Sequence, residues 1–220
     1  VDGDGDLDLA VGNHGQPSQL YRNDNGMLAG VPTWTSSASA NTWSIAWGDV
    51  DGDGDLDLAS GNEDQPTSVF LNVDGRLGTS PGWQAPQSAN TRSVAWGDVD
   101  GDGKLDLAVG NYEQPNQLYH NDGRTSAGTP TLTLSAWSPP AATTLSVAWG
   151  DYNGDGRPDL AVGNIGQPNQ LYPNTNGALG AADVWSPPAA RTSSGSITTC
   201  SSRIRARSKR RTSTNRSEER

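Results

Sequence analysis

Four stretches of the sequence place acidic residues at every second position, a spacing that suits a divalent cation. In the second stretch, Asp49, Asp51 and Asp53 stand at positions 1, 3 and 5 of a nine-residue loop, with Gly54 at position 6 and Asp57 at position 9. Alternate carboxylates on a tight loop converge on one point, and Ca²⁺ takes six to eight oxygen ligands at about 2.3–2.6 Å. Without a cation these carboxylates would repel one another, or their pKa values would have to rise far. The pattern D-x-D-x-D-G-x-x-D therefore predicts a calcium site, and it suits Mg²⁺ less well because Mg²⁺ keeps several of its waters.

The copies of this loop differ in charge and completeness. Gly54 permits the sharp turn that aims the backbone carbonyl of position 7, here Asp55, toward the ion. The fourth copy has one charge fewer because Asn153 replaces an Asp, and the first copy lacks position 1, so we expect it to be weak or empty. We therefore expect three to four Ca²⁺ ions. The predicted metal-binding residues are Asp2, Asp4, Asp6, Asp8, Asp49, Asp51, Asp53, Asp55, Asp57, Asp98, Asp100, Asp102, Lys104, Asp106, Asp151, Asn153, Asp155, Arg157 and Asp159.

The loop is not an EF-hand. An EF-hand needs a bidentate Glu at position 12, where this chain has Ser60, Val109 and Val162. The residues that follow form a short apolar run of β type rather than an amphipathic helix.

Composition excludes several classes of partner. The 220 residues have a net charge of -10, and because residues 203–220 hold eight Lys or Arg and two Glu, the remainder is more acidic still. Such an acidic body argues against binding to nucleic acid. No apolar run is long enough to span a membrane. The single cysteine, Cys200, excludes an intrachain disulfide framework and a cysteine-based zinc site.

The loop belongs to a larger tandem repeat. SIAWGDVDGDGDLDLASGN begins at Ser44, SVAWGDVDGDGKLDLAVGN at Ser93 and SVAWGDYNGDGRPDLAVGN at Ser146, and the chain opens inside the same unit. Each unit reads as four short strands separated by Gly, Pro and Asn. A tandem repeat whose unit contains four short strands predicts an all-β fold of β-propeller blades, each of four antiparallel strands. The expected blades are residues 1–40, 41–89, 90–141 and 142–190, followed by a disordered, basic Ser/Thr/Arg-rich tail at 191–220.

Tryptophans recur once in the first strand and once in the last segment of each unit. We expect both sets to pack blade against blade, although a surface for stacking sugars is the alternative. Trp43 has no counterpart in the other units, which makes it a candidate for a special contact. The recurring residues are Trp47, Trp96 and Trp149 in the first strands, and Trp34, Trp83, Trp137 and Trp185 in the last segments.

These motifs resemble the FG-GAP/VCBS repeat family, which is related to the propeller of integrin α subunits. The resemblance covers residues 1 to about 190, although the FG and GAP strings are replaced by WGD and GNxGQP. It implies a seven-bladed propeller with calcium in the loop between the first two strands of a blade. It also implies an extracellular protein that serves in adhesion, ligand binding or as an accessory part of a larger protein. About four blades are present, so we expect an arc of a larger ring, with further blades in a longer chain, rather than a closed small propeller.

Function should reside where the repeats differ, on loops that a rigid scaffold holds. The loops between second and third strands lie on the rim opposite the calcium loops, and their variable residues form the predicted ligand face. These residues are His14, Glu63, Asp64, Tyr112, Glu113 and Ile165. No catalytic constellation is visible. We expect a non-catalytic extracellular module that binds a glycan or protein ligand at the cell surface; the alternative is the scaffold portion of a larger secreted enzyme whose active site lies elsewhere.

Overall fold

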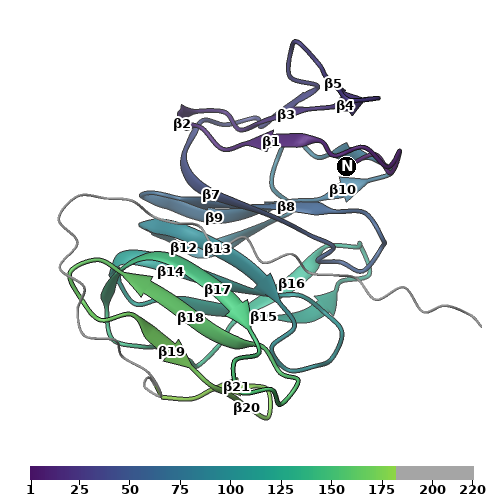
Figure 1. The fold of residues 1–220 in the computed structure, drawn as a ribbon. Helices are drawn as coiled ribbons and strands as arrows, with labels where there is room; N and C mark the ends of the chain where they lie inside the picture. The colour runs from purple at the N-terminus through teal and green to yellow at the C-terminus, as the bar shows by residue number, and fades with distance from the viewer. Residues whose placement is uncertain (182–220) are drawn as a thin grey trace, which may run out of the picture. The chain divides into compact units, whose positions relative to one another are not determined.

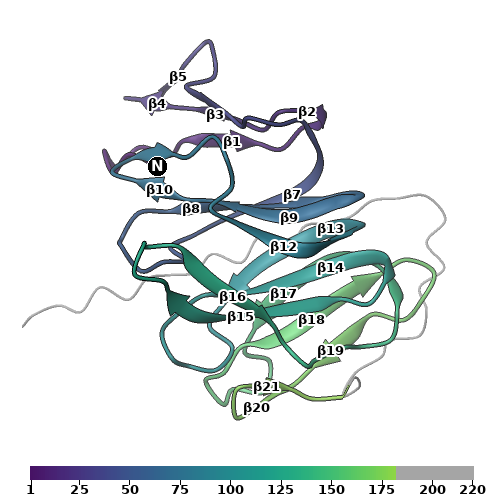
Figure 2. The ribbon, with the colours of Figure 1, turned by 180° about the vertical axis from the view of Figure 1, so that it is seen from behind.

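The structure, a computed structural model, describes residues 1–181. The predicted tail and Trp185 lie outside the described residues. Within them the fold is all-β, as the repeat predicted, and no helix is present that could cross a membrane. Figures 1 and 2 show the sheets stacked one on the next along the chain, from purple to green.

Two blades are complete antiparallel meanders of four strands. The second blade consists of β7 (Ala40–Gly48), β8 (Asp57–Asn62), β9 (Gln65–Phe70) and β12 (Trp83–Ala89). The third blade consists of β13 (Thr91–Gly97), β14 (Asp106–Gln114), β15 (Gln117–Arg124) and β16 (Pro130–Leu134). The first blade has β1 (Leu9–Val11), β3 (Gln19–Tyr21) and β6 (Trp34–Thr35), and the fourth has β17 (Ala142–Gly150), β18 (Asp159–Asn164) and β19 (Gln170–Tyr172).

Short additional elements connect and extend these blades. β2 (His14–Gln16), which follows the second strand of the first blade, pairs with β7 of the second blade. Three hairpins follow the third strands: β4 (Asn23–Asp24) with β5 (Met27–Leu28), β10 (Asn72–Val73) with β11 (Arg76–Leu77), and β20 (Asn174–Thr175) with β21 (Ala178–Leu179). Their turns are Asn25-Gly26, Asp74-Gly75 and Asn176-Gly177, all with positive φ at both residues. Such Asn-Gly and Asp-Gly pairs are a strong hairpin signal, which our four-strand interpretation overlooked.

Glycines let the first strands of neighbouring blades lie close together. A Cβ placed on Gly48 would lie 2.7 Å from Trp96 of the next blade, and one on Gly97 would lie 2.7 Å from Trp149. The indole nitrogen of Trp96 donates to the Ala46 carbonyl (3.2 Å). The indole nitrogen of Trp149 donates to the Ala95 carbonyl (3.1 Å). These first-strand tryptophans therefore pack blade against blade.

The second set of tryptophans makes an equivalent contact farther out. Trp34, Trp83 and Trp137 each meet an aromatic ring of the next blade edge-on. Their partners are Phe70 (5.2 Å between centroids), Tyr119 (5.1 Å) and Tyr172 (5.0 Å). The structure corrects one detail: Trp137 lies beyond β16, which ends at Leu134, rather than within a fourth strand. The Trp137 ring still contacts Tyr172, so this blade makes the same aromatic contact as the others although its strand ends before the tryptophan.

The core is divided among the blade interfaces. One cluster joins buried residues of the second and third blades, among them Val69, Val94 and Leu107, and another joins the third and fourth blades through Val147 and Leu160. Each blade therefore buries its apolar face on its neighbours, as repeat folds do.

Candidate metal centre

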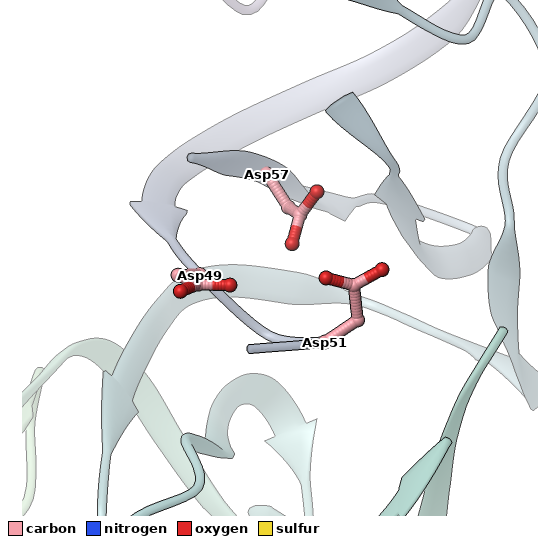
Figure 3. Close-up of side chains that lie close together, drawn as sticks. All are labelled: Asp49, Asp51 and Asp57. Carbon is pink, nitrogen blue, oxygen red and sulfur yellow. The ribbon is translucent and has the colours of Figure 1, made fainter. Parts of the chain in front are cut away.

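The acidic loops lie between the first two strands of each blade. The strands that flank each loop are in fixed register, because Gly48 pairs with Asp57 and Gly97 pairs with Asp106. In the second blade this arrangement brings Asp49, Asp51 and Asp57 together, with one carboxylate oxygen from each lying within 4.8 Å of the others. Figure 3 shows the three side chains around a common space. Two oxygens that each lie about 2.4 Å from one Ca²⁺ ion can be at most about 4.8 Å apart, so the geometry fits this ion.

Backbone amides hold the loop in shape. The carboxylate of Asp49 accepts the N–H groups of Gly52 (2.8 Å), Asp53 (3.1 Å) and Gly54 (3.1 Å). Gly52 and Gly54 adopt positive φ values of 73° and 101°, a region that glycine enters without steric cost. The loop is thus folded around the first carboxylate by its own backbone.

Asp57 is the buried member of the cluster. Its side chain accepts the N–H of Val50 (2.9 Å) and the N–H of Asn72 (2.8 Å), and no part of the residue is exposed. Burial raises the pKa of Asp57 to about 6, and burial together with the neighbouring charge of Asp53 raises that of Asp51. Burial and like charge disfavour the ionised carboxylates, and a bound cation would relieve both penalties.

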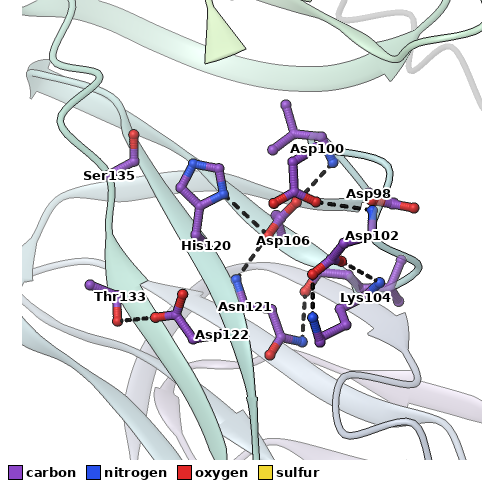
Figure 4. A network of polar contacts seen from close by, with 12 residues as sticks. Asp98, Asp100, Asp102, Lys104, Asp106, His120, Asn121, Asp122, Thr133 and Ser135 are labelled. Atoms are coloured by element: carbon purple, nitrogen blue, oxygen red, sulfur yellow. Dashed lines mark hydrogen bonds and ion pairs between the residues drawn. The ribbon is translucent and has the colours of Figure 1, made fainter. Parts of the chain in front are cut away.

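The third loop repeats the arrangement with Asp98, Asp100 and Asp106, whose carboxylate oxygens also lie within 4.8 Å of one another. Figure 4 shows this loop and its surroundings. Burial raises the pKa of Asp106. The position-5 carboxylate lies outside the cluster of three in both loops, and in the third loop Asp102 forms an ion pair with Lys104.

The fourth and first loops are less complete. In the fourth, Asp151 accepts the N–H groups of Gly154 and Gly156 as its counterparts do, but Asn153 supplies an amide in place of a carboxylate. In the first, Asp8 accepts the N–H of Asn23 (2.9 Å), and Asp2 forms an ion pair with Arg22 (3.1 Å). Among the described residues, two clusters of three carboxylates are therefore formed, in the second and third loops.

Comparison with known families accounts for all of the described residues. The FG-GAP-like repeat matches residues 1–60, 50–109 and 98–162, and the FG-GAP repeat matches residues 143–184. The chain belongs to the FG-GAP repeat family. The resemblance inferred from the sequence is thereby confirmed. No functionally curated protein matches the chain.

Among solved structures, the FG-GAP chain is similar to the crystal structure of BBS1N in complex with ARL6DN, soaked with mercury. The TM-score is 0.49 and the sequence identity is 14%. The match covers 80% of this chain and 49% of that one, so this chain spans about half the length of that protein.

The rim opposite the acidic loops of the FG-GAP blades carries a cluster of aromatic and charged side chains. Glu63 accepts a hydrogen bond from the Trp43 indole (3.1 Å), pairs with Arg92 at 2.5 Å and lies 3.5 Å from His14. The Arg92 guanidinium lies over the Trp43 ring (4.1 Å) and beside the Tyr112 ring (5.2 Å). We call these five residues, from three blades, the rim cluster.

The structure assembles half of the predicted ligand face and adds two residues. His14, Glu63 and Tyr112 meet in the rim cluster. Asp64, between β8 and β9, and Glu113, near the end of β14, instead have positive φ values of 57°, and Ile165 is half exposed on the fourth blade. Arg92 was missed. The signal was present, because Trp43 and Arg92 occupy the same variable position of the first strand in successive repeats.

The hydrogen bond from Arg92 to Glu63 lowers the pKa of this carboxyl to about 2. The Glu63 carboxylate is therefore ionised throughout the neutral range, and Trp43 of the same cluster is 54% exposed.

Proposed function

We propose that this chain is a non-catalytic, calcium-binding module of an extracellular protein, in which Ca²⁺ stabilises the blades and the opposite rim binds a glycan or protein ligand. The observation that carries the proposal is the pair of clusters formed by Asp49, Asp51 and Asp57 and by their counterparts in the third blade. In this proposal the ion has a structural role, because it neutralises carboxylates that the fold holds close together.

The loop chemistry favours an extracellular location. Calcium sites of extracellular modules have Kd values of about 10⁻⁴–10⁻³ M, and the ligand charge and the rigidity of the site tune this affinity. Such sites fill at the millimolar calcium concentrations found outside cells. The loops of this chain are largely exposed apart from the position-9 aspartates and two valines, which agrees with affinities in this range; the buried residues are Asp57, Asp106, Asp159, Val50 and Val99.

The rim cluster supports a ligand-binding role. Exposed Trp side chains offer a flat apolar face beside a polar edge, and such residues are enriched at binding surfaces. Here Trp43 is more than half exposed and lies against a fixed ion pair, Glu63 with Arg92. A rigid surface of this kind suits a ligand with both apolar faces and hydroxyl or charged groups.

Calcium binding is tested by titration calorimetry and equilibrium dialysis on the chain. We expect at least two bound Ca²⁺ ions, a much weaker response to Mg²⁺, and loss of both ions in the double variant Asp49→Ala, Asp98→Ala. Asp24→Ala is the matched control, because Asp24 is an exposed aspartate outside the loops. Unchanged stoichiometry in the double variant would contradict the proposal.

Ligand binding is tested on glycan and extracellular-protein arrays in the presence of Ca²⁺. We expect retention of the chain on a defined ligand and its loss in Trp43→Ala. Ile165→Ala serves as the control, because Ile165 is exposed on the same rim but outside the rim cluster. Equal retention of both variants would show that the rim cluster has no part in binding.

A further inference from the structure

One asparagine in each of the second, third and fourth blades contacts two acidic loops at once. In the third blade, the backbone N–H of Asn121 donates to Asp106 (2.8 Å), and its side-chain amide donates to the Leu105 carbonyl of the same loop (3.2 Å). The same amide also donates to the Val50 carbonyl (2.7 Å), which belongs to the loop of the second blade. Figure 4 shows Asn121 beside the third loop.

The arrangement repeats in the blades on either side. Asn174 of the fourth blade donates to Asp159 (2.7 Å), to the Pro158 carbonyl (3.1 Å) and, across the blade boundary, to the Val99 carbonyl (2.6 Å). Asn72 of the second blade does the same with Asp57 and Leu56 in its own loop and with Val1 in the first loop (3.0 Å). All three asparagines are buried.

The first blade provides an internal comparison. Its equivalent residue, Asn23, donates to Asp8 and to the Leu7 carbonyl within its own loop. No bond to another blade's loop is formed by Asn23 among the described residues, and this side chain is only partly buried. The cross-blade bond is thus formed by the asparagines of the three blades that follow another described blade.

The carbonyl that receives the cross-blade bond lies in the backbone of the acidic loop. Val50 stands between Asp49 and Asp51, two of the clustered aspartates, and its carbonyl belongs to the peptide bond with Asp51. Val50 is buried, whereas its counterpart Tyr152 in the fourth loop is half exposed. A hydrogen bond at this peptide fixes the relative positions of the two carboxylates.

The next blade also contacts the position-3 aspartate through residues at or after the end of its third strand. Arg124 of the third blade lies 3.7 Å from Asp51 of the second, and a Cβ placed on Gly177 of the fourth blade would lie 2.9 Å from Asp100 of the third. Gly177 has a φ of 84°, so the close approach depends on glycine at this turn.

We propose that the calcium loops of the first three blades are each positioned by the following blade, and that Asn72, Asn121 and Asn174 are the positioning residues that couple the calcium sites of adjacent blades. This inference rests on the proposed calcium function. The third loop holds Asn121 in place, so the Asn121 amide is already positioned to donate to the Val50 carbonyl. A second loop that is held in shape before the ion binds loses less conformational entropy on binding. Coupling between sites is reciprocal, so occupancy of one loop also favours the geometry of the next.

The test is a calcium titration of the ¹⁵N-labelled chain by NMR, with the amides of Gly54, Gly103 and Gly156 as reporters of the second, third and fourth loops. Loss of the buried Asn121 amide leaves the carbonyl in each of the two loops without its donor. We expect Asn121→Ala to weaken the calcium Kd of both the second and the third loop by about fivefold to tenfold.

The matched controls are the same substitution at the equivalent positions of the fourth and first blades. Asn174→Ala should weaken the third and fourth loops more than the second, and Asn23→Ala should leave the third and fourth loops unchanged. An effect of Asn121→Ala that is confined to the third loop would overturn the inference.

If Asn121→Ala does not fold, the variant Asp49→Ala tests the coupling between the second and third loops. Asp49→Ala removes a ligand from the surface of the second loop and leaves Asn121 in place. We expect it to weaken calcium binding at Gly103 severalfold, whereas an unchanged third loop would overturn the coupling. Absence of any calcium-dependent shift in the unaltered chain would instead overturn the proposed calcium function together with this inference.

Discussion

Removal of calcium should lower the thermal stability of the chain by a measurable amount. If an extracellular site has a Kd of about 10⁻⁴ M and free Ca²⁺ is about 1 mM, each occupied site adds about 1.4 kcal/mol to the free energy of unfolding. The two clusters of three carboxylates, in the second and third loops, would then contribute about 3 kcal/mol together. A change of 1 kcal/mol shifts the melting temperature of a domain of this size by about 2–4 °C, so we expect a decrease of about 6–12 °C.

Differential scanning calorimetry in 1 mM Ca²⁺ and in EDTA measures this shift. The variant Asp49→Asn, Asp98→Asn is the control for chelator effects, because it should melt at the same temperature in both buffers. Calcium-independent melting of the unaltered chain would refute the reasoning, since it would show that the clustered carboxylates are accommodated without an ion.

Two further predictions concern the blade interfaces. Gly97→Ala should lower the free energy of unfolding by about 1–3 kcal/mol in urea denaturation, because the new Cβ would lie 2.7 Å from the Trp149 ring. Gly150→Ala, at the equivalent position with nothing within 4 Å, should change it by less than about 0.5 kcal/mol, and equal effects would contradict the packing argument. The pKa of Glu63 is lowered to about 2 by Arg92, so the stability this pair contributes is present above the ordinary pKa of 4.5 and is lost as the pH falls toward 2. The difference in urea midpoint between the unaltered chain and Glu63→Gln should therefore be present at pH 7 and vanish near pH 2, and a constant difference would contradict it.

The repeat made much of the fold predictable. Strand positions, antiparallel order and the location of the acidic loops follow from short patterns that recur about every 50 residues. The hairpins after the third strands were not predicted, because Asn25-Gly26 and its counterparts were interpreted only as breaks between the strands of a blade. The fourth strand of the third blade was predicted to include Trp137, but it ends at Leu134. The Trp pattern did not reveal this, because Trp137 keeps its packing contact with Tyr172 outside the strand.

The sequence by itself determined which residues form the acidic loops, because the spacing of Asp49, Asp51 and Asp57 is a property of nine consecutive residues. It could also mark the variable positions of each repeat. Only the tertiary structure decided which of these meet across blades. Glu63 and Arg92 are far apart in the chain, and Asn121 reaches Val50 from another blade. Such contacts depend on how blades stack, which is set by the buried glycine and tryptophan surfaces rather than by any local pattern.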